Sequence, residues 1–143
     1  MILEDEAATL ALGASLARQA RGGDTITLSG PLGVGKTALA RGFLAALGHE
    51  GEVPSPTFAI VQPYDLAELP VWHADLYRIE QPEELDEIGL DCAEEGLLLV
   101  EWPGRAGKRA WPHALRLTLA FADDGARRLT ADVPPAWEGR WPL

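Results

Sequence analysis

One stretch of the chain has residue types and a spacing that suit phosphate binding. Residues 30–37 read Gly-Pro-Leu-Gly-Val-Gly-Lys-Thr and fit the phosphate-loop pattern G-x-x-x-x-G-K-[ST] at every fixed position. Such glycines let consecutive backbone N–H groups turn inward around a phosphate, at the positive end of a following helix. Lys36 would then reach the β and γ phosphates, and the Thr37 hydroxyl would serve a nucleotide-bound Mg²⁺. The alternative interpretation is a glycine-rich turn with an accidental lysine.

Two carboxylates come directly after predicted strands. Glu101 follows the apolar run 97–100, which is typical of a strand buried on both faces and gives Glu101 the place of a Walker-B acid. Asp75 follows the less apolar run 71–74. One acid would bind Mg²⁺ and the other would orient water, and the residues do not decide which does which. Each also has a plainer reading, Glu101 as an ordinary strand-end acid and Asp75 as the cap of the turn 76–78.

Other polar and aromatic side chains are weaker candidates. Thr57, which follows Pro56, would present its hydroxyl to Mg²⁺ or to the γ phosphate when a triphosphate is bound, and would then behave as a switch. Alternatively it begins a strand, because threonine suits strands. Trp102, beside the strand-end acid, is a candidate for shaping the site. His73 reads as a half-buried strand residue and Cys92 as a small apolar filler, since neither has a recognisable partner.

The phosphate loop needs a strand before it and a helix after it, and the hydrophobic pattern predicts both, at 25–28 and 37–47. Strands and helices alternate first, and an antiparallel pair follows. We therefore predict an α/β, P-loop NTPase-like three-layer fold, whose mixed sheet has a parallel nucleotide-binding centre and a C-terminal antiparallel hairpin. Further strands are predicted at 57–61, 71–74, 96–101, 115–119 and 128–133, further helices at 4–21 and 82–89, turns at 63–70 and 123–125, and a loosely held tail at 134–143.

Composition limits the class of protein. A chain of 143 residues has room for one ordinary core, so we predict a single domain over 1–143. Acids outnumber bases 22 to 12, and the net charge of -10 argues against strong direct binding of nucleic acid. The single cysteine, the absence of signal-peptide character at the amino terminus and the absence of a long apolar run predict a cytoplasmic protein without a membrane span.

Four motifs together are more specific than the phosphate loop alone, and their combination resembles the TsaE (YjeE) family of bacterial ATPases. The resemblance covers roughly residues 4–132. In chain order the motifs are Gly30-x-Leu32-Gly33-x-Gly35-Lys36-Thr37, Ser55-Pro56-Thr57-Phe58, His73-x-Asp75-Leu76-Tyr77-Arg78 and Leu99-Val100-Glu101-Trp102-Pro103.

The resemblance implies a small ATPase that uses ATP and Mg²⁺. It is required for threonylcarbamoyladenosine in tRNAs that read codons beginning with A, and its hydrolysis supports turnover of a TsaB–TsaD heterodimer. By resemblance, Thr37 and Glu101 match the Mg²⁺ positions, Lys36 the phosphate lysine, Asp75 the second essential acid and Thr57 the switch threonine.

The resemblance also implies which residues border the nucleotide. The expected contacts are Leu32, Gly33, Val34, Gly35, Lys36 and Thr37 in the loop, and Glu6 and Thr9 near the base. The family often has a glycine-arginine element in its hairpin, and here Gly125-Ala126-Arg127-Arg128 leaves open which arginine corresponds. A small-molecule kinase and a non-hydrolysing, ATP-dependent binding module are the alternative functions.

Overall fold

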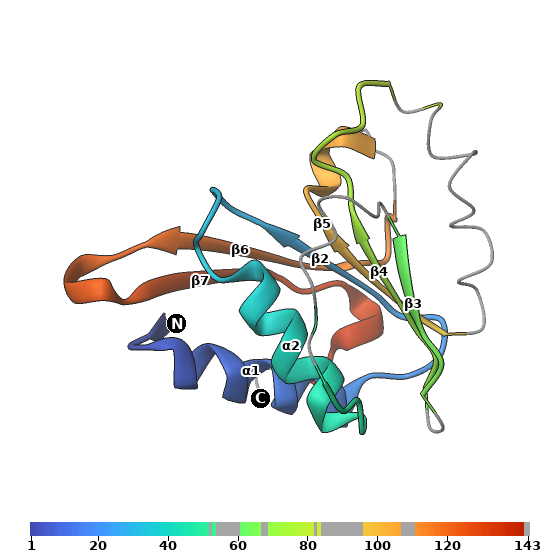
Figure 1. Ribbon diagram of the computed structural model, residues 1–143, viewed down its shortest axis with the longest axis horizontal. Coiled ribbons are helices and arrows are strands. Elements are labelled where there is room, and N and C mark those ends of the chain that lie inside the picture. The colour runs from blue at the N-terminus through green and yellow to red at the C-terminus, as the bar shows by residue number, and fades with distance from the viewer. Residues whose placement is uncertain are drawn as a thin grey trace.

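The computed structural model describes residues 1–51, 53, 61–66, 69–81, 83, 96–106 and 111–141. The described strands form a seven-stranded sheet in the order β1-β7-β6-β2-β5-β4-β3 (Figure 1). The strands are β1 Ile2–Leu3, β2 Thr25–Ser29, β3 Val61–Tyr64, β4 Val71–Asp75, β5 Leu97–Glu101, β6 Leu115–Phe121 and β7 Arg127–Asp132.

The centre of the sheet is parallel, as the sequence predicts. Strand β2 pairs in parallel with both β5 and β6, and β4 pairs in parallel with β5. Strands β6 and β7 form the predicted antiparallel hairpin, with the short 3-10 turn η4 Asp123–Gly125 between them. The mixed α/β sheet with a C-terminal hairpin is therefore confirmed.

Both edges of the sheet differ from the prediction. Strand β1 lies outside the hairpin and pairs antiparallel with β7. On the other side, β3 pairs antiparallel with β4 and includes Pro63, which we predicted to begin a turn. A proline lacks the N–H that a central strand needs, but an edge strand tolerates it. The rest of the strand predicted at 57–61 and nearly all of the helix predicted at 82–89 lie outside the described residues.

Two α-helices, α1 Glu6–Gln19 and α2 Lys36–Ala46, lie side by side on one face of the sheet (Figure 1). Asp5 caps α1, because its side chain accepts a hydrogen bond from the Ala8 N–H at 2.8 Å. The helices and the sheet share one apolar core. Its fully buried members include Leu16, Leu39, Phe43 and Leu44 from the helices and Ile26, Leu28, Leu97, Leu99, Leu115 and Leu117 from the strands.

The two helices meet backbone to backbone at two glycines. A Cβ added at Gly13 of α1 would collide with the Leu39 carbonyl oxygen, and one added at Gly42 of α2 would collide with the Leu10 carbonyl oxygen. This close approach fixes α2 against α1. Because α2 begins at the end of the phosphate loop, the contact also helps to position the end of that loop.

The chain's end corrects our prediction that residues 134–143 form a loosely held tail. The 3-10 turn η5 Pro135–Trp137 places the Trp137 side chain in the core, fully buried. Arg140 is also buried, and its guanidinium lies over the Trp137 ring at 4.0 Å. The prediction followed the prolines of this segment and left open whether Trp137 fills the core or anchors another protein; the structure places it in the core.

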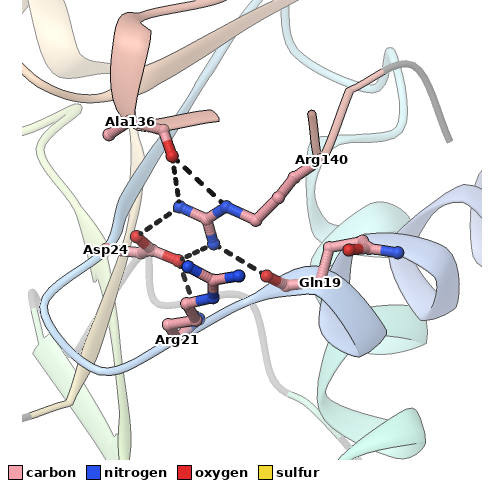
Figure 2. Close-up of polar contacts among 5 residues, drawn as sticks. All are labelled: Gln19, Arg21, Asp24, Ala136 and Arg140. Atoms are coloured by element: carbon pink, nitrogen blue, oxygen red, sulfur yellow. Dashed lines mark hydrogen bonds and ion pairs between the residues drawn. The ribbon is translucent and has the colours of Figure 1, made fainter. Parts of the chain in front are cut away.

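Figure 2 shows how Arg140 is held. Its terminal nitrogens donate to both carboxylate oxygens of Asp24, at 2.7 and 3.0 Å, and to the carbonyl oxygens of Gln19 at 2.7 Å and Ala136 at 2.8 Å. The Asp24 carboxylate also accepts from the Arg21 N–H at 2.7 Å. A bidentate pair of this kind, between the buried Arg140 and the mostly buried Asp24, fixes geometry as well as charge. It ties the carboxyl end of the chain to the residue that precedes β2.

No helix among the described residues is long and apolar enough to cross a membrane.

We expect Arg140→Ala to lower the free energy of unfolding by about 3 kcal/mol, because it leaves the mostly buried Asp24 carboxylate without its cationic partner. Denaturant unfolding followed by tryptophan fluorescence measures this change. Arg128→Ala is the matched control, since Arg128 is exposed, and it should change the same quantity by less than about 0.5 kcal/mol. Equal stability of the two variants would show that the ion pair does not hold the tail.

We expect Gly42→Ala to lower the free energy of unfolding by about 1–3 kcal/mol, although alanine favours a helix more than glycine does. The added methyl must push α2 away from the Leu10 carbonyl. Gly104→Ala is the control, because a Cβ at that glycine meets nothing within 4 Å. If Gly42→Ala proved as stable as the wild type, the helices would not be in backbone contact.

Candidate functional site

The phosphate-loop residues form a tight turn between the end of β2 and the start of α2. Gly30 and Gly35 have φ values of 144° and 116°, a region that disfavours residues with a side chain. Gly35 is the N-cap of α2, so the first turn of the helix opens directly onto the loop. The loop's own amides and the positive end of α2 therefore face the same small region, which suits an anion.

A cavity of about 370 Å³ lies at this place. It brings together side chains from the loop, from α2 and from the carboxyl ends of β4 and β5, which adjoin in the sheet. The sequence predicted Lys36, Thr37, Asp75 and Glu101 as one site, and the structure places all four on this cavity. The lining consists of Leu32, Gly33, Gly35, Lys36, Thr37, Ala38, Asp75, Tyr77, Glu101 and Trp102.

The Lys36 side chain folds back over the loop. Its ammonium donates to the Gly30 carbonyl oxygen and to the Pro31 carbonyl oxygen, the latter at 3.1 Å, and it lies 4.0 Å from the centre of the Trp102 ring. Burial lowers the pKa of Lys36, while the negative charges of Glu101 and Asp75 oppose that shift. The Lys36 ammonium is thus held at the loop by backbone carbonyls, and phosphate oxygens could replace these carbonyls as acceptors.

Glu101 is the centre of a short chain of polar contacts. The Thr37 hydroxyl donates to its carboxylate, with both oxygens at 3.4 Å. On its other side, the Glu101 Oε2 atom lies 2.6 Å from His73 Nε2, and both side chains are buried. A histidine nitrogen that carries a hydrogen can donate to a carboxylate oxygen at this distance. His73 therefore orients the acid that faces Thr37.

His73 is a site residue that our sequence reasoning missed. We read it as a half-buried strand residue without a partner, yet it is fully buried and bonded to Glu101. A signal was present, because His73 and Asp75 lie two residues apart on a strand and so share a face.

Asp75 combines two interpretations that the sequence left open. Its Oδ1 atom accepts the Tyr77 N–H at 2.8 Å, which caps the turn after β4, and its side chain also lines the cavity. Asp75 is the sheet neighbour of Glu101. Burial raises the pKa of Asp75, and the nearby Glu101 charge raises it further, against the Tyr77 N–H, His73 and Lys36, which lower it.

Trp102 closes one side of the cavity. Its φ of 60° is unusual for a residue with a side chain, and its N–H donates to the Leu28 carbonyl oxygen at 3.2 Å. In this conformation the indole covers Lys36 and lies 5.0 Å from the Tyr77 ring, centre to centre. We expected Trp102 to shape the site, and Tyr77, to which we assigned no role, joins it there.

A second cavity, of about 240 Å³, lies beside the loop and shares Gly33, Gly35 and Ala38 with the first. It is also lined by Val34 and by residues of the amino-terminal segment and the hairpin: Asp5, Glu6, Thr9, Gly125 and Arg127. The structure thus brings Glu6 and Thr9, which we expected near a nucleotide base, to the flank of the loop.

Among those residues, Thr9 is buried, whereas Glu6 is exposed and pairs with Arg41 at 3.3 Å. The expected loop contacts also differ in exposure, because the Leu32 side chain is exposed whereas the Val34 side chain is buried. Thr57, our candidate switch, lies outside the described residues.

The site's oxygen donors fit a small, hard cation. The Thr37 hydroxyl and the Glu101 carboxylate face one another across a distance that one ion could bridge, with the Asp75 carboxylate on the neighbouring strand. Mg²⁺ prefers oxygen ligands and binds through few carboxylates when phosphates supply the rest.

Comparisons with known proteins agree with this geometry. The family model described as "Threonylcarbamoyl adenosine biosynthesis protein TsaE" matches residues 3–129. A curated relative from Bacillus subtilis (strain 168), named tRNA threonylcarbamoyladenosine biosynthesis protein TsaE, is 37% identical over 124 residues, 85% of this chain and 77% of the relative. The relative of the same name from Nostoc sp. is 32% identical over 141 residues, 94% of this chain and 85% of its own length.

The relative of that name from Haemophilus influenzae is 38% identical over 102 residues, 69% of this chain, and the match spans just 64% of the relative. Among solved structures, the crystal structure of Bacillus subtilis YdiB superposes with a TM-score of 0.82 at 30% identity, covering 98% of this chain and 88% of that one. On these matches, and with the loop and acids placed as described, this chain belongs to the TsaE family, whose members act in tRNA threonylcarbamoyladenosine biosynthesis.

Proposed function

We propose that this protein is a Mg²⁺-dependent ATPase whose hydrolysis supports threonylcarbamoyladenosine formation on tRNA. The observation that carries the proposal is the convergence of Lys36, Thr37, Asp75 and Glu101 on one cavity at the amino end of α2. These are a phosphate cation, a hydroxyl and two acids, which is the set that hydrolysis of a nucleoside triphosphate requires.

Each residue has a role that its surroundings support. The loop amides and Lys36 would hold the β and γ phosphates, with the ammonium exchanging the Gly30 and Pro31 carbonyls for phosphate oxygens. Thr37 and Glu101 would hold Mg²⁺, which when bound gathers the charge that develops between the β and γ phosphates. His73 keeps the Glu101 carboxylate aimed at Thr37.

The Asp75 carboxylate, whose Oδ1 atom accepts the Tyr77 N–H, would orient the attacking water. Its raised pKa, caused first by burial, makes it a better proton acceptor than an ordinary surface aspartate. We assign it the role of orienting water, and assign Glu101 to the metal because the Thr37 hydroxyl contacts the Glu101 carboxylate.

The wider function is also a proposal. We propose that the chain acts as a single ATPase domain in the cytoplasm and that its partner is a TsaB–TsaD heterodimer, with tRNA bound by the partners. The acidic balance, 22 acids against 12 bases, disfavours direct capture of a phosphate backbone by this chain.

We expect Lys36→Ala and Glu101→Ala each to lower ATP turnover more than tenfold, at least about 1.4 kcal/mol in the activation barrier. Release of phosphate from Mg²⁺-ATP is measured with the protein alone and with TsaB–TsaD. Arg128→Ala and Glu138→Ala remove one exposed charge of each sign and should leave turnover unchanged.

Wild-type turnover in both site variants would count against this site. Transfer of the γ phosphate to an added small-molecule acceptor would favour the kinase. Nucleotide binding without hydrolysis, with or without the partners, would favour the binding module.

We expect Asp75→Asn to lower turnover and yet to raise the thermal unfolding midpoint at pH 7. Because the pKa of Asp75 is raised above its ordinary 3.8, the folded chain holds that proton more tightly than the unfolded chain does. The wild type therefore loses stability as pH rises from about 3.8 through the folded-state pKa, and the uncharged variant does not. Thermal melts of both proteins from pH 3 to pH 8 test the difference, which should vanish at the acidic end. A lower midpoint for Asp75→Asn at pH 7 would contradict it.

A further inference from the structure

Arg127, the first residue of β7, joins the C-terminal hairpin to the phosphate loop. Its Nε–H donates to the Val34 carbonyl oxygen at 2.9 Å, between residues 93 positions apart in the chain. Val34 lies inside the loop and is buried. The contact therefore reaches the loop's backbone directly.

The Arg127 guanidinium is itself held in place. Its Nη1 atom donates to the carbonyl oxygens of Gly125 at 2.9 Å and Ala126 at 3.2 Å, and the group lies 4.7 Å from the centre of the Phe121 ring. Phe121 is the cross-strand partner of Arg127 in the β6–β7 pair. The arginine is thus a fixed donor, not a freely moving surface cation.

This donor controls the direction of one peptide unit. In a trans peptide the C=O and the following N–H point in opposite directions, so fixing the Val34 C=O also fixes the Gly35 N–H. Val34 and Arg127 line the second cavity, whereas Gly35 also lines the first, with Lys36 and Thr37. Holding the carbonyl toward the second cavity turns the Gly35 N–H toward the first. Gly35 has a φ of 116°, and because glycine adopts many φ values, its own backbone preference does not fix the orientation of this peptide unit.

We propose that Arg127 is a positioning residue for polyphosphate binding, which acts by holding the Val34 carbonyl so that the Gly35 N–H faces the phosphates. The proposal rests on the proposed function, in that the loop must bind nucleotide phosphates. Of the hairpin's two arginines, Arg127 is therefore the one assigned to the loop. Arg128 is exposed, and its backbone pairs with Ile2 of β1.

The competing role for Arg127 is direct contact with the nucleoside, because Arg127 also lines the second cavity. The two roles predict different ligand dependence. A residue that orients the loop affects tripolyphosphate and a non-hydrolysable ATP analogue alike. A residue that contacts base or ribose affects the analogue and spares tripolyphosphate.

The test uses the full chain and measures the affinity of each ligand, with Mg²⁺, by calorimetry. We expect Arg127→Ala to weaken both ligands by about tenfold, the value of one charge-assisted hydrogen bond. Arg128→Ala removes the same charge from the neighbouring residue and should change neither affinity. Arg127→Lys keeps the charge without the planar fork, and it should recover less than half of the loss on a logarithmic scale.

A second readout needs no ligand. In ¹H–¹⁵N spectra, Arg127→Ala should shift the amide signals of Gly33 and Gly35 and speed their hydrogen exchange, while Arg128→Ala should not. Should Arg127→Ala fail to fold, Phe121→Ala loosens the same guanidinium and should give smaller changes of the same kind.

Unchanged affinities and spectra in Arg127→Ala, a loss confined to the ATP analogue, or full recovery by Arg127→Lys would each overturn the positioning role. Failure of the wild-type chain to bind either ligand would instead overturn the proposed function on which it rests.

Discussion

The placement of the Lys36 ammonium is the constraint on which the site depends. Removing an ammonium from water is costly unless acceptors and opposite charges surround it. Here the loop carbonyls of Gly30 and Pro31 accept its hydrogens, Trp102 covers it, and the acids Asp75 and Glu101 lie close by. These groups come from the loop, from the end of β4 and from the end of β5. The buried charge therefore requires the loop, β4 and β5 to be correctly assembled together.

The parallel centre of the sheet provides that assembly. Parallel strands end at the same edge, so Asp75 and Glu101 become neighbours although they come from separate segments. Asp75 is buried and lies next to a second acid, and both conditions raise its pKa. Two neighbouring carboxylates with little access to water repel each other and lower the stability of the fold. Under the proposed function, this arrangement lowers stability and provides a carboxylate that accepts a proton readily.

Local sequence was sufficient for the loop and the acids, because their signals are short: a fixed spacing of glycines and lysine, and a carboxylate after an apolar run. It was insufficient where contacts join distant segments. Arg140 meets Asp24 across 116 positions, Arg127 meets Val34 across 93, and His73 meets Glu101 across 28. Such pairings depend on strand order, which the hydrophobic pattern does not encode. The edge positions of β1 and Pro63 were missed for the same reason.

The burial of Trp137 has a practical consequence. The match to the family model ends at residue 129, whereas the core extends to Trp137 and Arg140. A recombinant chain cut at residue 129 would lack the Trp137 indole, which belongs to the core, and the Arg140 partner of Asp24, the residue before β2. Domain limits taken from the family model would therefore cut through the folded unit. An affinity tag is better attached after residue 143 than used to replace the last residues.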